Sequence, residues 1–502
     1  MTAKDLTLPG KPVHPWLHTL RICQAPSLPA PSAAEAYPPH DALLSEASAG
    51  LLREFARLGH IVQQRPDAQT DILFTTARFG EVLDWREALL FNYRRRFGLR
   101  HTPAIYTLVH IAPGELQQHL ARLELSLRRA TPDPSEFAYP GLADRAARVL
   151  FEQGRRGGPI LAFERLVQAQ VKCLRILLFV GDERPEYAYH FDLVGAHPRI
   201  EAVGAGAEEA FYRDLALRLA AVASTREVTQ HEFTGDAIPA ATWRSLTTPP
   251  AMRHAARELD RRHFFTEMVV IANLVSVPVV SGAVASQYSE ACFATWEPAL
   301  AALITTATGC LRPVDKGNIS DRDLTVVVGM RPDASGALVR PVEGMGEQAP
   351  SSESVEMYDM DGALPRVDLG DGRGATAPVA RSKLHGHRGV GAYDPALVEF
   401  VPLDEAYYHY PVNCGTAAQA EGIKAAFARS VALRNPNDPR QVAFTVLPGH
   451  GAVIVEKWVP GKAPFQVIWE YMDAGSLRIE SRIPQGLHHY EPGADGMMVL
   501  RE

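Results

Sequence analysis

Cysteine is scarce in this chain, and its few cysteines are scattered. The five lie at positions 23, 173, 292, 310 and 414, and no two of them form a Cys-x-x-Cys pair. This odd, dispersed set argues against a disulfide framework and against a structural zinc ribbon, because both need paired cysteines. We therefore expect reduced thiols and a reducing compartment.

Long apolar runs and an excess of basic residues are missing as well. No window approaches the run of about 20 apolar residues that a membrane-spanning helix needs. The first residues also lack the apolar segment of a secretory signal peptide. The net charge of -7 is not the basic footprint that nucleic-acid-binding proteins usually carry. We expect a cytoplasmic protein with neither membrane nor nucleic-acid partners.

The composition is otherwise that of an ordinary globular protein. Hydrophobic residues make up 46% of the chain and charged residues 22%, so sizeable cores can be buried. A length of 502 residues exceeds what one core usually supports. The length alone predicts roughly two to four domains.

Short apolar segments alternate with amphipathic helices through the first part of the chain. Apolar residues at helical spacing predict helices over 46–59 and 207–222. Apolar runs predict buried strands at 71–76, 104–111, 173–181, 268–272 and 277–281. A Gly-Gly-Pro break at 157–159 divides the series. We therefore expect two doubly wound α/β domains, over 1–158 and 159–322.

The character of the sequence changes after a last apolar run at 324–328. Residues 331–400 are dense in Gly, Pro, Asp and Ser. Strand-like runs separated by turn residues follow at 443–447, 452–457, 465–470 and 477–481. This spacing predicts a β-rich, barrel-like C-terminal domain over 323–502. The predicted fold class is α/β, with two doubly wound domains followed by this β-rich domain.

The segment Gln287–Asn318 concentrates residues that can do chemistry. The strand predicted at 277–281 leads into it, and the apolar run 299–305 is most simply a helix. Glu290 and Cys292 would then lie in the loop at the carboxyl end of a strand, where open α/β sheets usually bind ligands. We expect the functional site here.

Two carboxylates flank that predicted helix. Glu290 and Asp315 are 25 residues apart (315 − 290), and a helix that returns the chain can bring them to one cleft. Paired carboxylates bind a hard divalent cation or divide acid and base roles between them. Alternatively, Glu290 is a charge at a helix N-terminus, and Asp315 pairs with Arg312 or Lys316.

Histidines supply further candidate ligands. His385 and His387 form a His-x-His pair, and in a strand both rings would point to one face. His450 lies in a predicted turn between two strands. Imidazole ligates first-row transition metals. Alternatively, His450 is a solvent-exposed or capping residue of the turn.

Two cysteines are candidate nucleophiles. Cys292 and Cys414 each lie beside small residues, which leaves a thiol accessible to a substrate. The alternative is an inert, buried thiol, since free cysteine is among the most buried residue types.

The segment Glu290–Asp315 resembles the metal-site segment of the L-fucose isomerase and L-arabinose isomerase superfamily. The resemblance rests on a glutamate after a strand, a small-residue helix, Thr308-Gly309, Pro313 and an acidic residue. It is confined to about residues 287–318, where Cys292 and Trp296 depart from the family pattern. The layout of two α/β domains and a β-barrel-like domain is also similar.

This resemblance implies a sugar isomerase. Glu290 and Asp315 would hold Mn²⁺ or another divalent metal together with one histidine, His387 ranking before His385 and His450. One carboxylate would remove a proton from an open-chain aldose or ketose to form an enediol, and the other would return it to the neighbouring carbon. The resemblance also favours a homo-oligomer. Two alternatives remain open: a different enzyme that uses Cys292 or Cys414 as nucleophile, and a non-catalytic sugar-binding protein.

Overall fold

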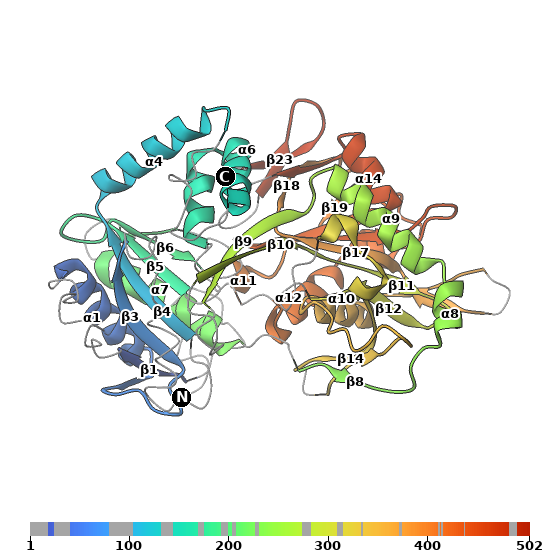
Figure 1. The fold of residues 1–502 in the computed structure, drawn as a ribbon, viewed down its shortest axis with the longest axis horizontal. Helices are drawn as coiled ribbons and strands as arrows, with labels where there is room; N and C mark the ends of the chain where they lie inside the picture. Colours follow the sequence, from blue (N-terminus) through green and yellow to red (C-terminus); the bar gives the residue numbers. More distant parts are fainter. Residues whose placement is uncertain are drawn as a thin grey trace. The chain divides into compact units, whose positions relative to one another are not determined.

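The protein is an α/β protein in the computed structural model drawn in Figure 1. The structure describes residues 19–24, 41–79, 104–131, 144–168, 175–191, 199–202, 207–225, 230–273, 283–308, 315–332, 335–370, 374–409, 412, 415–435, 437–480 and 489–501. Among the helices in these ranges, none is long and apolar enough to cross a membrane.

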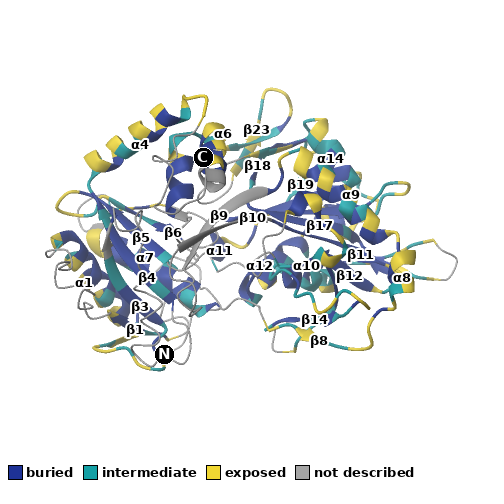
Figure 2. Ribbon diagram, in the orientation of Figure 1, coloured by how far each residue is buried: buried dark blue, intermediate teal, exposed yellow. Residues whose placement is uncertain are grey.

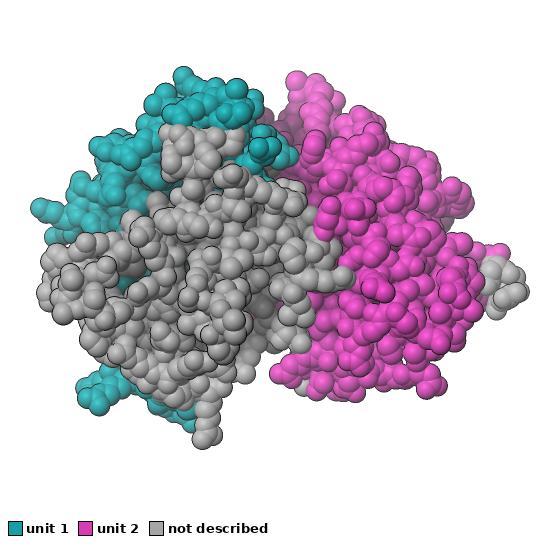
Figure 3. Space-filling view, in the orientation of Figure 1, with its two compact units in different colours: residues 1–224, 268–287, 409–411 teal, residues 225–267, 288–408, 412–502 magenta. Residues whose placement is uncertain are grey.

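The chain divides into two compact units (Figure 3). Unit 1 comprises residues 1–224, 268–287 and 409–411, and unit 2 comprises residues 225–267, 288–408 and 412–502. The structure therefore has two units, whereas the sequence predicts three domains. Neither predicted boundary coincides with a division between the two units.

Unit 1 contains a seven-stranded sheet in the order β2-β1-β3-β4-β5-β6-β7. Strands β1 to β5 are parallel, and β6 and β7 continue the sheet antiparallel. The strands are β1 (Arg21–Gln24), β2 (Ile61–Gln63), β3 (Ile72–Arg78), β4 (Ala104–Ile111), β5 (Arg175–Val180), β6 (Tyr187–Phe191) and β7 (Ile200–Glu201). The helices are α1 (Ala42–Arg57), α4 (Pro113–Leu127), α6 (Asp144–Gln168) and α7 (Ala207–Ser224).

The predicted elements of this unit are largely confirmed. The strands predicted at 71–76, 104–111 and 173–181 are β3, β4 and β5, and the predicted helices are α1 and α7. Helix α1 begins earlier than its apolar pattern because the Asp41 carboxylate caps it, accepting from the Leu44 N–H at 3.0 Å. Helices α1 and α7 pack on one core with residues of β3 and β4.

The domain boundary predicted after residue 158 is wrong. It falls inside helix α6, at a kink where Gly158 has φ +85° and Pro159 follows. The next strand, β5, pairs in parallel with β4 and so belongs to the first sheet. A Gly-Pro break bends a helix here and does not end a domain.

Unit 2 is built on a nine-stranded sheet, most of whose neighbours are antiparallel. Its order is β19-β20-β21-β17-β11-β12-β13-β14-β8. The strands are β8 (Glu232–Phe233), β11 (Cys292–Glu297), β12 (Ala302–Thr306), β13 (Leu324–Met330), β14 (Ala337–Arg340), β17 (Ala380–Gly386), β19 (Val398–Phe400), β20 (Val442–Leu447) and β21 (Gly451–Lys457). Strands β11, β12 and β21 are buried along their whole length (Figure 2).

Helices cover both faces of this sheet (Figure 1). Helices α9 (Thr248–Arg261) and α14 (Gln466–Asp473) share a core with Phe293, Leu384 and Ile454. Helices α10 (Ser354–Asp359) and α12 (Ala417–Phe427) pack on the opposite face. Unit 2 is thus an open sheet between two helical layers and not a barrel.

The remaining elements are short or lie beside the large sheets. Strands β18 (Gly389–Tyr393), β22 (Leu477–Glu480), β23 (His489–Pro492) and β24 (Met498–Arg501) form a four-stranded sheet. Strands β15 (Arg366–Asp368) and β16 (Thr376–Pro378) form one pair, and β9 (Thr266–Asn273) and β10 (Ala283–Glu290) another. Short helices are α8 (Ala240–Ser245), η2 (Lys316–Asn318), η3 (Asp321–Asp323), η4 (Met360–Ala363), α11 (Glu405–His409) and α13 (Val431–Arg434).

Two segments of unit 2 differ in type from their prediction. The helix predicted at 299–305 is a turn followed by strand β12, which lies between β11 and β13 and is buried on both faces. An apolar run of this length does not distinguish a buried strand from a buried helix. The strand predicted at 465–470 is helix α14, whose first N–H groups are bound by the Glu456 carboxylate.

The predicted boundary at residue 322 is wrong as well. It runs through the nine-stranded sheet, because β12 pairs with β13 and β11 pairs with β17. The strands predicted at 268–272, 443–447, 452–457 and 477–481 are β9, β20, β21 and β22, and the apolar run at 324–328 lies in β13. The strand predicted at 277–281 lies outside the described residues.

Candidate metal centre

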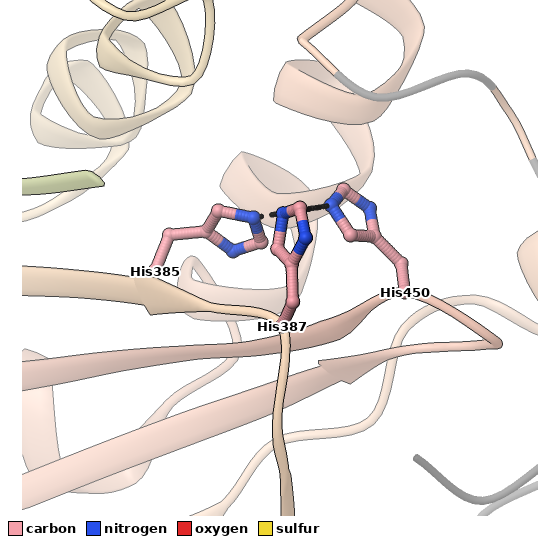
Figure 4. A group of neighbouring side chains, drawn as sticks. All are labelled: His385, His387 and His450. Carbon is pink, nitrogen blue, oxygen red and sulfur yellow. Dashed lines mark hydrogen bonds between the residues drawn. The ribbon is translucent and has the colours of Figure 1, made fainter. Parts of the chain in front are cut away.

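Three histidines meet at one end of the central strands of unit 2 (Figure 4). His385 lies in β17, His387 follows the end of that strand, and His450 closes the turn between β20 and β21. Strand β21 runs antiparallel to β17, with Gly386 opposite Ala452. The turn that carries His450 therefore lies beside the end of the strand that carries the other two rings.

The sheet register sets the direction of these rings. Leu384 packs toward α9 and α14. Since side chains alternate along a strand, His385 and His387 face the layer of α10 and α12. The prediction that both rings of the His-x-His pair point to one face is confirmed, with ring centroids 5.2 Å apart.

The three rings converge through their Nε2 atoms. The Nε2 of His450 is 3.1 Å from that of His385 and 3.2 Å from that of His387. One nitrogen of each ring lies within 4.8 Å of the others. All three side chains are buried, with 0%, 7% and 3% exposed for His385, His387 and His450.

The two separations that involve His450 are close to those in the coordination sphere of a single metal ion. Zinc–imidazole bonds of about 2.0–2.1 Å place tetrahedral ligand atoms roughly 3.3–3.4 Å apart. The observed separations of 3.1 and 3.2 Å need only a small expansion to reach that value. A metal ion accepts only an unprotonated ring nitrogen. Burial and the nearby His387 lower the pKa of His385 to about 4, which keeps that ring neutral at pH 7.

A glutamine supports the cluster from helix α12. Thr416 caps this helix, its Oγ1 accepting from the Gln419 N–H at 3.2 Å. The cap brings Gln419 into the first turn, where its Nε2 lies 2.9 Å from the Nδ1 of His450. The Gln419 Oε1 accepts from the Gly415 N–H, also at 2.9 Å. A buried polar contact thus holds the outer nitrogen of His450.

Two carboxyl groups lie at the start of helix α10. The negative charge of half-buried Glu353 opposes the lowering of the His385 pKa and adds to the raising of the Glu356 pKa. Glu356 is 1% exposed, and burial, with the charge of Glu353, raises its pKa well above the ordinary value. Neither glutamate is identified from the sequence as a candidate site residue. Their spacing of three residues is a helical signal, but α10 has only six residues and lies in a Gly- and Pro-rich stretch.

Asp315 does not join the histidines. It is exposed, and its carboxylate accepts from the Gly317 N–H at 3.0 Å as the cap of η2. Burial raises the pKa of Asp260 in α9, and the charge of Asp315 adds to this rise; α9 lies on the sheet face opposite α10 and α12. The expected return of the chain assumed a helix at 299–305, and strand β12 replaces that helix. Glu290 ends strand β10, two residues before Cys292, and its side chain lies outside the described residues.

Cys292 is an inert thiol in this structure. It is a strand residue of β11 and not a loop residue, with no exposed surface. Its Sγ lies 3.4 Å from the Oγ1 of Thr305 and 3.9 Å from the Sδ of Met357. Burial raises its pKa to about 11, whereas a nucleophile must be a thiolate. Cys414 lies outside the described residues.

Comparisons with models of protein families, with curated proteins and with solved structures found no match for this chain.

Proposed function

We propose that this protein is a metal-dependent enzyme whose centre is His385, His387 and His450. The convergence of three buried imidazole nitrogens carries this proposal. Three polar rings in a core are costly to bury unless a partner satisfies them. A divalent cation satisfies all three Nε2 atoms at once and leaves coordination positions for a substrate.

The proposed metal is a first-row transition ion such as Zn²⁺ or Fe²⁺. From the sequence we expect Mn²⁺, because two carboxylate ligands are assumed there and oxygen ligands suit that ion. Three imidazoles favour zinc, iron, nickel or copper instead. Since Asp315 is distant, the ligand set now proposed is the three histidines, and Glu290 stays a prediction from the family resemblance.

The proposed reaction is proton transfer next to a carbonyl group, as in the isomerisation of an open-chain aldose or ketose. When bound, the metal supplies a Lewis acid that polarises the substrate's oxygens. Glu353 is the proposed acid and base in the role first assigned to Asp315, since its negative charge acts on His385. It takes the proton from one carbon and returns it to the adjacent carbon, while the hydroxyl proton of the substrate passes to the former carbonyl oxygen, so the reaction needs no oxidant.

Metal binding is tested on the purified full chain by elemental analysis after incubation with Zn²⁺, Fe²⁺, Co²⁺ and Mn²⁺ in turn. We expect one equivalent of metal in the wild type and in His254→Ala, and less than a tenth of that in His385→Ala, His387→Ala and His450→Ala. His254 is a matched control because it is an exposed histidine of α9 on the other face of the sheet. Wild-type protein that stays metal-free with every ion contradicts the proposal.

The reaction is tested by deuterium exchange. Aldoses and ketoses are incubated with the metal-loaded protein in D₂O, and NMR follows deuterium at the carbon next to the carbonyl. We expect Glu353→Gln to retain the metal and to lose about 10²–10⁴-fold in exchange rate. A metal-loaded protein that binds a sugar without exchanging any proton supports the non-catalytic sugar-binding alternative instead.

A further inference from the structure

Gln419 has both ends of its amide engaged. It is 3% exposed, with Oε1 at 2.9 Å from the Gly415 N and Nε2 at 2.9 Å from the His450 Nδ1. A backbone N–H can only donate, so the atom facing Gly415 is the amide oxygen. The amide nitrogen also only donates, so the Nδ1 of His450 is the acceptor.

This arrangement fixes the tautomer of His450. A neutral imidazole carries one proton, and with Nδ1 accepting, that proton is on Nε2. The Nε2–H then faces the Nε2 atoms of His385 and His387, at 3.1 and 3.2 Å. These contacts hold the three rings together by hydrogen bonding. The same proton blocks the nitrogen that a metal needs.

Half a turn of the Gln419 amide removes the block. The Oε1 then accepts from an Nδ1–H of His450, which leaves Nε2 unprotonated and able to ligate. The turn deprives the Gly415 N–H of its acceptor. Glu356 can replace it, since its two buried oxygens have no hydrogen-bond partner among the described residues and the Gly415 N–H lies within reach of this carboxyl group.

We propose that Gln419 is a positioning residue whose amide orientation selects between a hydrogen-bonded and a metal-binding form of the three histidines, with Glu356 as the acceptor that permits the turn. This inference rests on the proposed metal centre. It assigns a role to two residues that do not themselves ligate the metal.

The first test measures Co²⁺ affinity by competition with a chromophoric chelator and records the visible d–d spectrum of the bound ion. Gln419→Glu presents a permanent acceptor to Nδ1–H, and we expect it to bind at least tenfold more tightly than the wild type. Gln419→Met presents none, and we expect about tenfold weaker binding, within the range measured for such outer residues. Equal affinities and spectra for wild type, Gln419→Glu and Gln419→Met overturn the inference.

A matched control comes from helix α14 on the other face of the sheet. Gln466 also has both amide ends engaged, with the Ala463 N–H at 2.9 Å and the Glu470 Oε1 at 2.8 Å. Gln466→Met should bind Co²⁺ as the wild type does. For Glu356, we expect Glu356→Gln to keep the affinity because an amide oxygen still accepts, and Glu356→Met to lose about tenfold. Equal affinity of these two variants excludes Glu356 as the acceptor.

A measurement on the wild type removes any dependence on the folding of variants. With ¹⁵N-labelled histidine, two-bond ¹H–¹⁵N spectra report which ring nitrogen carries the proton. We expect one histidine to change from Nε2–H to Nδ1–H when Zn²⁺ is added. Wild type that binds no metal refutes the metal centre itself, whereas bound Zn²⁺ with no change of tautomer refutes only the amide turn.

Discussion

Two physical effects make Gly415 sensitive to substitution. Its φ is +62°, a conformation that residues with a Cβ adopt at a cost of roughly 1–2 kcal/mol. A Cβ at this position would also lie 2.4 Å from the Cβ and Oγ of Ser352. Forcing a methyl group into such a contact costs about 1–3 kcal/mol. Gly415→Ala should therefore lower the free energy of unfolding by about 2–5 kcal/mol.

Gly461 separates the two effects. Its φ is +75°, yet an added Cβ would meet no atom within 4 Å. Gly461→Ala carries the conformational cost alone, and we expect a loss of about 1–2 kcal/mol. Any gain from a less flexible unfolded chain is common to both variants and cancels in the comparison.

Urea unfolding of both variants, followed by circular dichroism, measures these losses. The Co²⁺ affinity should rise in Gly415→Ala, because the shifted backbone N–H no longer holds Gln419 in the orientation that protonates the His450 Nε2, and it should stay unchanged in Gly461→Ala. Equal losses of stability in the two variants would refute the contact with Ser352. Unchanged Co²⁺ affinity in Gly415→Ala would refute the link to the metal centre.

Three further predictions concern unit 2. Zn²⁺ at 100 times its dissociation constant should stabilise the wild type by about 2.7 kcal/mol in urea unfolding, an effect that a chelator reverses and that His387→Ala lacks. Lys383→Met leaves the buried Asp361 carboxylate without its ion-pair partner and should cost about 3–5 kcal/mol, most of it recovered in the double variant with Asp361→Leu. Burial raises the pKa of Glu456 from 4.5 to about 7, so protonation of this group contributes fully to the free energy of unfolding below pH 4.5, and this contribution is lost as the pH rises to 7. In Glu456→Gln, the urea concentration at the unfolding midpoint should change less with pH over that range. A Glu456→Gln protein with the wild-type pH dependence would contradict the argument from burial of Glu456. A Lys383→Met protein as stable as the wild type would contradict the argument from the buried ion pair.

The sequence contains enough to predict the histidines but not their other partners. The His-x-His spacing predicts two rings on one face of a strand, and the structure adds His450 from a turn that strand pairing brings beside them. No local pattern encodes that pairing, since the two histidine segments are 63 residues apart. The same limit applies to Gln419, which reaches His450 only through tertiary packing of α12.

The two misassigned elements of unit 2 have one physical cause. Strand β12 and helix α14 are short apolar runs, and burial on both faces of β12 removes the alternation that marks a strand. The misassigned helix at 299–305 then placed Asp315 beside Glu290. In unit 1, clear helical spacing and uninterrupted apolar strands allowed α1, α7 and β3 to β5 to be predicted close to their observed bounds.

For the proposed metal centre, the order in which the three histidines are synthesised has a consequence for metal selection in the cell. His387 is synthesised 63 residues before His450, which corresponds to about 3–13 s at the usual rate of about 5–20 residues per second. During that interval a nascent chain offers only a two-imidazole chelate, whose preference follows solution affinity, with Cu²⁺ first. The geometry that discriminates between ions arises only after β21 pairs with β17. We therefore expect a protein with the proposed centre to depend on the cell to keep competing copper scarce while it is being translated.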